Sequence, residues 1–390
     1  MNMLFVHNWI KLSPEIVKTG FVEGKPVGGK NTNMWRYIEA FSTNSDVEAH
    51  VITEPIKNYP TVEQYNNIYI YHLSGNKVWR RFHQTQQLAK QIVEKHNIQA
   101  IFYDFTPLNY MYLSIVPLLK LNIPIIAHTD FDFFRWDVPI QKKLLHKCRA
   151  LHTLTEIYRQ HFIRHGFNNV HVIPSPINTT HYSPSADSGK FREKHGLNNK
   201  TIITYVRGRD LLAEQFIKKV TPYFKEVIFC FVGGFNFPAI HRDNILFTGV
   251  VPQNELIEII ATSDLCLSLV EGFESLPLST KLIFYMGLEG LLQRTVECTS
   301  LVTRLMEYGA CATPTLAVGS KAITNAFQEE KEVFLVNNRK RDWINVIRNL
   351  LENPELMREV GINARKRVEK NYSYKPAAEK MIKMFKSVIN

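Results

Sequence analysis

The sequence lacks the features that mark several large classes of protein. No stretch approaches the roughly 18 uninterrupted apolar residues that a membrane-spanning helix needs. The first residues, MNMLFVHNWIKLSPE, have no basic region, long apolar run or small-residue cleavage site of the kind found in a signal peptide. We therefore expect a cytoplasmic protein whose chain opens with a β-strand rather than a leader.

Cysteine is sparse and is not arranged for metal binding or disulfide formation. The five cysteines form no CxxC pair, and no histidines lie beside them at zinc spacing. They are Cys148, Cys230, Cys266, Cys298 and Cys311. Scattered cysteines in apolar surroundings are typical of a reducing compartment, where the side chain acts as a small hydrophobic group. We expect neither a structural metal nor a disulfide.

The chain is basic, with a formal net charge of +11, but it lacks the motifs of nucleic-acid-binding proteins. It has no Arg-rich tail, zinc finger or aromatic RNP-type strand, so we expect no nucleic-acid partner. Two basic clusters lie at 77–83 and 141–149, and a helical reading of the second puts Lys143 and Lys147 on one face. A solvated face explains them best, and contact with the anionic inner face of a membrane is the second interpretation.

The sequence does contain a regular alternation of short apolar runs and longer helical patterns, which predicts parallel α/β sheets. A chain of 390 residues suits two domains, and a stretch at 175–200 that is rich in proline, serine and asparagine separates two such series. We therefore predict two Rossmann-like domains, 1–178 and 179–374, which face each other across a cleft. Ligand-binding loops are expected at the carboxyl ends of their strands.

The predicted elements divide between the two series. Strands are expected at 3–9, 48–54, 67–73, 100–105, 124–129, 150–155 and 170–175 in the first series. Those of the second series are expected at 201–208, 227–234, 245–250, 264–270, 313–318 and 333–336. The clearest helical patterns lie at 32–42, 82–97, 155–166 and 254–263.

A glycine pair follows the first predicted strand, in VGGKNTNMW at 27–35. Gly28 and Gly29 let the backbone approach a ligand closely, and the amino terminus of the helix after them favours an anion. A plain strand-to-helix turn explains the pair equally well. It is a candidate phosphate-binding turn on weak evidence, since no GxGxxG is present.

A histidine ends a buried strand in IPIIAHTDFDFF at 123–134. His128 therefore lies where the carboxyl edge of a sheet faces a ligand, although a satisfied polar residue at a strand end is the alternative. The following Asp130 and Asp132 match DxD, a metal–nucleotide motif of single-domain glycosyltransferases. That motif belongs to a different fold and often occurs by chance, so we expect no metal site there.

Two arginines flank a glycine after the first strand of the second series, in YVRGRDLL at 205–212. An arginine on such a turn is well placed to bind phosphate oxygens through its planar group. Alternate residues face apart, so the two arginines need not both point inward. We favour Arg209 over Arg207, with Lys218 or Lys219 on the following helix as a further cation.

Four segments resemble, in order along nearly the whole chain, motifs of the retaining glycosyltransferases of family 4. They are VHVIPSPINTTHYSP at 170–184, CFVGG at 230–234, NILFTGVVPQNELIEIIATSDLCLSLVEGF at 244–273 and NYSYKPAAEKMIKMF at 371–385. The resemblance implies the GT-B fold, with two Rossmann-like domains and a C-terminal helix, 375–390, that returns to the first domain. It also implies transfer of a hexosyl-type sugar from a nucleotide-diphosphate sugar, with retention at the anomeric carbon and without a metal.

The same resemblance assigns expected roles to several of these residues. Gly28 and Gly29 match the glycine loop near the diphosphate and acceptor, and Gly234 matches a glycine at a nucleotide-binding strand end. His128 resembles the histidine beside the transferred sugar, although the order here is HTD rather than THD. Arg209 resembles the phosphate-binding arginine, and the lysine that accompanies it in the family has no clear equivalent.

The acidic pair of the family, E-x7-E, is altered in this chain. Glu271 supplies the first glutamate, with Glu274 as the runner-up, but Ser279 stands eight positions later where the second is expected. Two octets resemble the element around the second glutamate, which holds the ribose hydroxyls. STKLIFYM carries Phe284 at the acidic position, whereas VTRLMEYG carries Glu307 and continues as ACATP. Glu307 is therefore the expected ribose ligand, with a solvated helix residue as the alternative.

An insertion of about 23 residues, at 281–303, separates the two halves of the altered motif. Its pattern predicts a helical hairpin at the nucleotide site, where it would cover the donor or change donor choice.

Taken together, the resemblance implies a UDP- or GDP-sugar donor, a glycan or lipid-linked acceptor, and no cofactor. Two alternatives remain open at this point. The altered acidic pair fits a GT-B protein that binds a nucleotide-sugar or glycan without efficient transfer. A sugar-nucleotide epimerase of the same fold is the other.

Overall fold

The structure is a computed structural model of the chain, in which the described residues form two units. They are residues 1–7, 10–19, 21–22, 25–26, 29–57, 60–74, 78–105, 112–129, 138–206, 211–234, 242–269, 300–337 and 339–389. The first unit contains the described residues up to Pro176 together with those from Tyr374 onward, and the second contains the described residues between 177 and 373.

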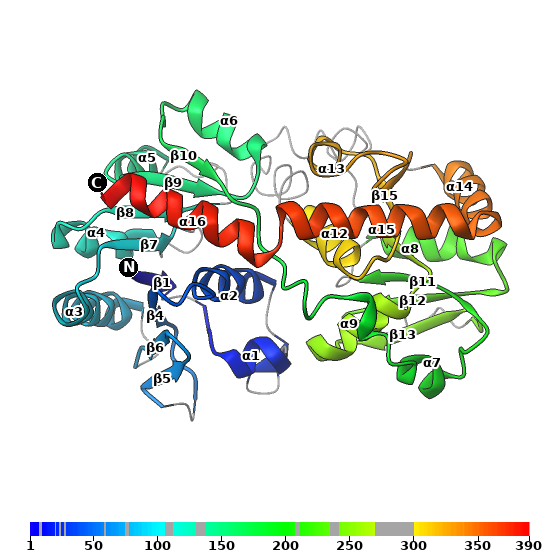
Figure 1. The fold of residues 1–390 in the computed structure, drawn as a ribbon, viewed down its shortest axis with the longest axis horizontal. Helices are drawn as coiled ribbons and strands as arrows, with labels where there is room; N and C mark the ends of the chain where they lie inside the picture. Colours follow the sequence, from blue (N-terminus) through cyan, green and yellow to red (C-terminus); the bar gives the residue numbers. More distant parts are fainter. Residues whose placement is uncertain are drawn as a thin grey trace. The chain divides into compact units, whose positions relative to one another are not determined.

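The first unit is built on an eight-stranded sheet in the order β10-β9-β8-β7-β1-β4-β6-β5 (Figure 1). The strands are β1 Asn2–His7, β4 Glu48–Thr53, β5 Val62–Tyr65, β6 Ile68–His72, β7 Ala100–Asp104, β8 Ile125–His128, β9 Ala150–Thr153 and β10 Val170–Val172. All neighbours pair in parallel except β5, which pairs with β6 in the antiparallel sense. The central strands are mostly apolar and buried, as parallel strands covered on both faces must be.

Helices cover both faces of this sheet and enclose two apolar cores. They are α1 Pro14–Thr19, α2 Gly29–Phe41, α3 Val78–His96, α4 Ile115–Leu118, α5 Val138–Leu145, α6 Glu156–Arg164 and α16 Tyr374–Ile389. A short 3-10 turn, Leu119–Leu121, and a two-stranded hairpin of β2 Phe21–Val22 and β3 Lys25–Pro26 complete the unit. Phe385 of α16 contacts Phe41 of α2 and Phe5 of β1, so the C-terminal helix packs in the first unit, as predicted.

The second unit has a six-stranded sheet, entirely parallel, in the order β13-β12-β11-β14-β15-β16 (Figure 1). Its strands are β11 Thr201–Val206, β12 Val227–Val232, β13 Ile245–Gly249, β14 Leu265–Ser268, β15 Thr315–Val318 and β16 Phe334–Val336. The helices are α7 Lys190–His195, α8 Leu211–Lys219, α9 Gln253–Thr262, α12 Ser300–Ala310, α13 Lys321–Ala326, α14 Lys340–Glu352 and α15 Pro354–Asn371, with 3-10 turns at Pro184–Ala186 and Thr221–Tyr223. Its apolar core joins β11, β12 and β14 to α8 and α14.

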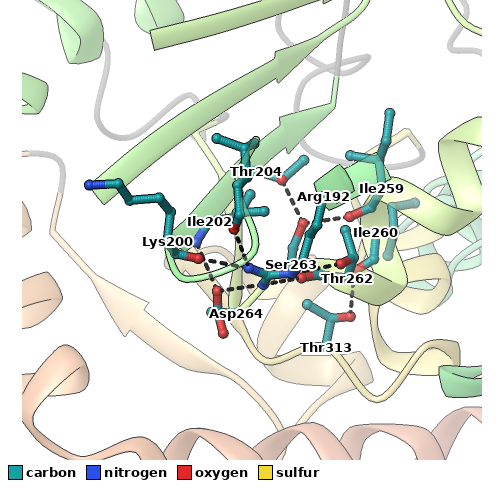
Figure 2. A network of polar contacts seen from close by, with 11 residues as sticks. Arg192, Lys200, Ile202, Thr204, Ile259, Ile260, Thr262, Ser263, Asp264 and Thr313 are labelled. Carbon is teal, nitrogen blue, oxygen red and sulfur yellow. Dashed lines mark hydrogen bonds and ion pairs between the residues drawn. The ribbon is translucent and has the colours of Figure 1, made fainter. Parts of the chain in front are cut away.

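One arginine joins the amino ends of β11 and β14 in the second unit (Figure 2). Arg192 of α7 donates to the carbonyl oxygens of Thr262 at 2.7 Å and Lys200 at 2.7 Å, and to Asp264 Oδ2 at 3.1 Å. The same Asp264 oxygen accepts from the backbone N–H of Ile202 in β11 at 2.8 Å. Because Asp264 directly precedes β14, this network lies at the amino edge of the sheet. Ligands bind such sheets at the opposite edge, where the carboxyl ends of the strands lie.

The structure differs from the sequence-based predictions at an edge strand and at the end of one helix, among other details. The edge strand β5, Val62–Tyr65, is not predicted, because its residues are mostly exposed and carry no apolar run. The helix α5 ends at Leu145, so Lys147 lies beyond it and the predicted shared helical face with Lys143 is wrong. Within the described residues, no helix is both long enough and apolar enough to cross a bilayer.

Candidate functional site

The structure describes four of the seven predicted site residues. Gly29 begins α2, His128 ends β8, Gly234 follows β12 and Glu307 lies in α12. Three others, Gly28, Arg209 and Glu271, lie outside the described residues. So do Arg207, Glu274, Ser279, Phe284, Asp130, Asp132 and nearly all of the insertion, of which only the start of α12 is described.

A row of polar side chains closes the carboxyl edge of the first sheet. Asp104, His128 and His152 are register partners on the neighbouring strands β7, β8 and β9. His7 ends β1 and places Nδ1 3.4 Å from Asp104 Oδ2, with both side chains 1% exposed. Side chains in one row of a parallel sheet share a face, so a histidine and acid cluster is built at the edge where ligands bind.

His7, Asp104 and His152 were not predicted as site residues. Their signal in the sequence is that each stands at or next to the last position of an otherwise apolar strand, in MLFVH, AIFYD and ALHT. His128 shows the same pattern in IIAH. One such residue is weak evidence, but four at consecutive positions of one sheet edge form a single row.

The contact between His128 and His152 determines where their protons lie. Their Nδ1 atoms are 2.8 Å apart, so one must donate and the other accept. His152 Nε2 lies 2.9 Å from the carbonyl oxygen of Ile173, which can only accept, so this nitrogen carries a proton. Burial lowers the pKa of His152 from 6.5 to about 4, which leaves the ring neutral with a single proton. Nδ1 of His152 is therefore the acceptor, and Nδ1 of His128 donates.

This proton assignment makes Nε2 of a neutral His128 a hydrogen-bond acceptor. Aromatic rings hold the histidine in place: Phe102 stacks on it with ring centroids 5.9 Å apart, and Tyr37 of α2 lies 6.0 Å away. Tyr37 also donates its hydroxyl to the carbonyl oxygen of Ile173 at 2.7 Å. Because His128 is 0% exposed, its orientation is set by this packing.

In the second unit, Glu307 is a buried acid with defined partners, not a solvated helix residue. It is 5% exposed, and its Oε1 accepts from the hydroxyl of Tyr182 at 3.4 Å. Its Oε2 pairs with Arg304, one helical turn earlier in α12. Gln253 donates to the oxygen of the same Tyr182 at 3.4 Å, so a chain of donors points at the carboxylate. The carboxylate is therefore held in place by an arginine and a tyrosine hydroxyl.

Local packing explains why Glu307 lies where it does. The neighbouring Tyr308 accepts at its hydroxyl from the backbone N–H of Val206, the last residue of β11, at 3.3 Å. This contact places α12 beside the carboxyl end of β11. A side chain at Gly309 would crowd Val368 and Ala364 of α15, and one at Gly361 would meet the carbonyl oxygen of Ala312, so both glycines let these helices approach closely.

Gly234 lies in an exposed turn at the carboxyl end of β12. The preceding Gly233 has φ +129, a conformation that side chains disfavour, and donates its N–H to Gly249 at 2.8 Å. A Cβ atom at Gly234 would meet nothing within 4 Å, so the turn leaves room for a ligand to approach the backbone. The two glycines thus have different roles. Gly233 is required by the backbone conformation, whereas Gly234 borders open space.

Part of the chain matches a known protein family. Residues 209–383 match the model of a family described as glycosyl transferase-like. This match covers the segment that contains Glu307 and Gly234. No curated protein sequence matches the chain.

Similar solved structures span nearly the whole chain. A glycosyltransferase from Rickettsia africae has a TM-score of 0.70 at 12% identity and covers 100% of this chain and 98% of its own. Sucrose-phosphate synthase from Thermosynechococcus elongatus has a TM-score of 0.68 at 15% identity, with 100% and 99% covered. HepE from Anabaena, in complex with UDP, has a TM-score of 0.67 at 13% identity, with 99% and 100% covered. The predicted GT-B fold is therefore confirmed, and the family match together with these neighbours supports a glycosyltransferase of this fold.

Proposed function

We propose that the protein is a family 4 glycosyltransferase that moves a sugar from a nucleotide-diphosphate sugar to a glycan or lipid-linked acceptor, with retention of the anomeric configuration. The observation that carries this proposal is the buried carboxylate of Glu307, held by Tyr182 and Arg304. Its two oxygens suit the two hydroxyls of a ribose, and its position beside the carboxyl end of β11 is where a nucleotide binds in such sheets.

The diphosphate requires donors rather than a metal in this proposal. Gly29 begins α2, where a helix amino terminus favours an anion, and the turn at Gly234 leaves its backbone in open space. The sequence adds Gly28 as a further candidate donor to the diphosphate. Arg209 would bind the phosphate oxygens through its planar group. Charge develops on the leaving diphosphate during transfer, and fixed donors of this kind stabilise it without reorganisation.

His128 and Glu271 are the proposed catalytic residues. Because Nδ1 of His128 donates to His152, its Nε2 is set as an acceptor for a sugar hydroxyl. His152 is thus a positioning residue in this proposal. Glu271, the first glutamate of the altered acidic pair, is the second proposed catalytic residue.

The neighbours favour a uridine nucleotide as the donor, and a guanosine nucleotide is the alternative from the sequence. Structures of the Anabaena HepE protein contain UDP, UDP-glucose, or UDP with glucose. We propose that no cofactor is needed beyond the donor, and that the reaction takes place in the cytoplasm. Contact of the basic clusters with the inner face of a membrane would bring a lipid-linked acceptor within reach.

A donor panel tests the proposed function. The full chain is incubated with UDP-, GDP- and ADP-sugars, with and without oligosaccharide acceptors, and free nucleotide and products are separated by chromatography. We expect nucleotide release from one donor, accelerated by an acceptor, and a product whose new glycosidic linkage keeps the donor's anomeric configuration by NMR. Absence of release from every donor would contradict transfer, and binding without release would favour the alternative of a binding protein.

An epimerase is the second candidate, because the UDP-GlcNAc 2-epimerase of Neisseria meningitidis is also similar in fold, with a TM-score of 0.56. The same panel separates the two activities. An epimerase changes the sugar of UDP-GlcNAc without needing an acceptor, and its product is a new UDP-sugar. Transfer leaves free UDP and requires an acceptor for the glycosidic product.

A further inference from the structure

Three side chains on the amino side of the first sheet form a cluster that the proposed transfer does not use. Glu48 and His50 are two positions apart in β4 and so point to the same face of the sheet. His96 is the last residue of α3, which ends there because Asn97 adopts a left-handed conformation, with φ +48. One ligand atom from each of the three lies within 4.8 Å of the others.

His50 is the residue that this arrangement leaves unexplained. It is 0% exposed, and its Nε2 has no hydrogen-bond partner among the described residues. The 3.5 Å contact from Nε2 to Glu48 Oε2 is longer than an ordinary hydrogen bond. Buried polar atoms in folded proteins are nearly always paired, so a nitrogen that faces a carboxylate and a second imidazole at this distance points to a bound group between them.

The spacing fits a tetrahedral divalent cation. Two ligands at about 2.1 Å from a tetrahedral zinc ion lie about 3.4 Å apart, close to the separation of His50 Nε2 and Glu48 Oε2. His96 and Glu48 are partly exposed, so their side chains can rotate to shorten the remaining distances and can admit an ion from solvent. The ring centroids of His50 and His96 are already 4.3 Å apart.

The surroundings of His50 supply the second layer that metal-bound histidines usually have. Its Nδ1 lies 3.2 Å from the hydroxyl oxygen of Tyr71, which can accept a hydrogen bond from Nδ1–H and so leave the Nε2 lone pair for a metal. The ring of Tyr69 stacks on His50 with centroids 5.0 Å apart, which fixes the imidazole plane.

We propose that Glu48, His50 and His96 form a site for one borderline divalent cation, with Zn²⁺ as the best fit and water as the fourth ligand. Glu48 is the first residue of β4, whereas His128 is the last residue of β8, so the site lies at the opposite edge of the same sheet from the proposed transfer residues. A cation here would join the end of α3 to β4 and stabilise the first unit without taking part in transfer.

The chain offers a matched control for this site. His72 places Nε2 3.1 Å from Glu63 Oε1, so these residues form a histidine–carboxylate pair on the neighbouring strands β5 and β6. No second histidine joins them in a group of metal-binding spacing within the described part of the chain. A Glu63→Gln variant therefore removes a comparable contact without touching the proposed ligands.

The test is isothermal titration calorimetry with ZnCl₂ on full chain that has been freed of metal with a chelator. We expect one equivalent to bind and to raise the melting temperature. Glu48→Gln and His96→Gln should each weaken binding by more than about tenfold, while Glu63→Gln leaves it unchanged. MgCl₂ should not compete, since Mg²⁺ prefers oxygen ligands.

Three results would overturn the proposal. The first is a lack of stoichiometric Zn²⁺ binding by the wild type. The second is an affinity for Zn²⁺ in Glu48→Gln and His96→Gln that equals that of the wild type. The third is a loss of affinity in Glu63→Gln as large as that in the two ligand variants. Far-UV circular dichroism confirms that each variant is folded, which is expected because Glu48 and His96 are partly exposed. The readout is metal binding and thermal stability, so the result does not depend on whether the protein transfers sugar.

Discussion

Two histidine pairs at opposite edges of the first sheet differ in what surrounds them. His128 and His152, at the carboxyl ends of β8 and β9, meet directly through nitrogens 2.8 Å apart. His50 and His96, on the amino side, have ring centroids 4.3 Å apart with tilted planes, and both lie near the carboxylate of Glu48. The direct contact fixes one tautomer and leaves a nitrogen that can accept a hydrogen bond from a polar ligand. A carboxylate beside two imidazoles instead favours a cation. The same residue type therefore serves different chemistry at the two ends of the strands.

The second unit shows the same division with arginine and acid pairs. Arg192 and Asp264 join the amino ends of β11 and β14 through a network whose members all have protein partners. Arg304 and Glu307 lie in α12 beside the carboxyl end of β11. We expect changes at the carboxyl ends to alter activity and changes at the amino ends to alter stability, and the predictions below test this division.

The largest expected effect is a loss of activity in His128→Ala, compared with His50→Ala in the other histidine pair. His128→Ala should lower kcat/KM for transfer by about 100-fold, or about 2.7 kcal/mol, because a buried hydrogen bond to the sugar is lost. His50→Ala removes an equally buried histidine from the same sheet, so its cost in unfolding free energy should be similar. Its kcat/KM should stay within about threefold of the wild type. Steady-state kinetics and urea unfolding of both variants make the comparison, and equal losses of activity would contradict it.

The next effect is the contribution of His152 to the dependence of stability on pH. Burial holds the pKa of His152 at about 4 in the folded chain against 6.5 when unfolded, so the unfolded state binds more protons between these values. The contribution of His152 to the unfolding free energy is fully present above pH 6.5 and is lost as the pH drops toward 4. Acidification from pH 7 to 5 should cost about 2 kcal/mol through this residue alone.

A variant isolates the part of this dependence that belongs to His152. His152→Asn cannot titrate but keeps an acceptor oxygen near the position of Nδ1, so it should show a smaller loss of unfolding free energy between pH 7 and 5. Urea unfolding at both pH values measures the difference. An unchanged pH dependence would mean that His152 is not held neutral. It would then also contradict the proton assignment for His128, which depends on a neutral His152.

A smaller effect is expected at the amino ends of the second sheet. Arg192→Met removes several charge-assisted hydrogen bonds, but Asp264 is partly exposed and water can replace some of them. We expect a loss of about 1.5 kcal/mol in unfolding free energy, with the donor KM unchanged. A raised donor KM at unchanged stability would place this network in the binding site and break the division between the two edges.

Much of the fold could be predicted from the sequence because its strands are apolar runs between helical patterns. Each of the stretches predicted as strands overlaps a strand in the structure. The edge strand β5 was missed because VEQY is polar, although Asn66, with φ +55, marks the turn that joins it to β6. Edge strands gain less from burial, so their sequence carries less of the signal on which the prediction depends.

The site could be predicted only in part, because its residues meet through strand register and helix packing. That His128 ends a strand follows from IIAH, but its pairing with His152 depends on the register of β8 against β9. The similar octets at Ser279 and Val302 predict Glu307 rather than Phe284 as the acid, yet only packing shows that Glu307 is buried. The ring contact between His50 and His96 joins a strand to a helix end far along the chain, which no local motif reveals.

The central claim is that the carboxyl end of the second sheet holds a nucleotide through Glu307. Calorimetric titration of UDP and GDP into the wild type, Glu307→Gln and Asp264→Asn tests it most directly, because both variants neutralise one carboxylate of the same unit at opposite ends of its strands. We predict binding to the wild type, about tenfold weaker binding to Glu307→Gln, and an affinity for Asp264→Asn within about twofold of the wild type. Equal affinities for Glu307→Gln and the wild type, or no binding of either nucleotide, would contradict the account.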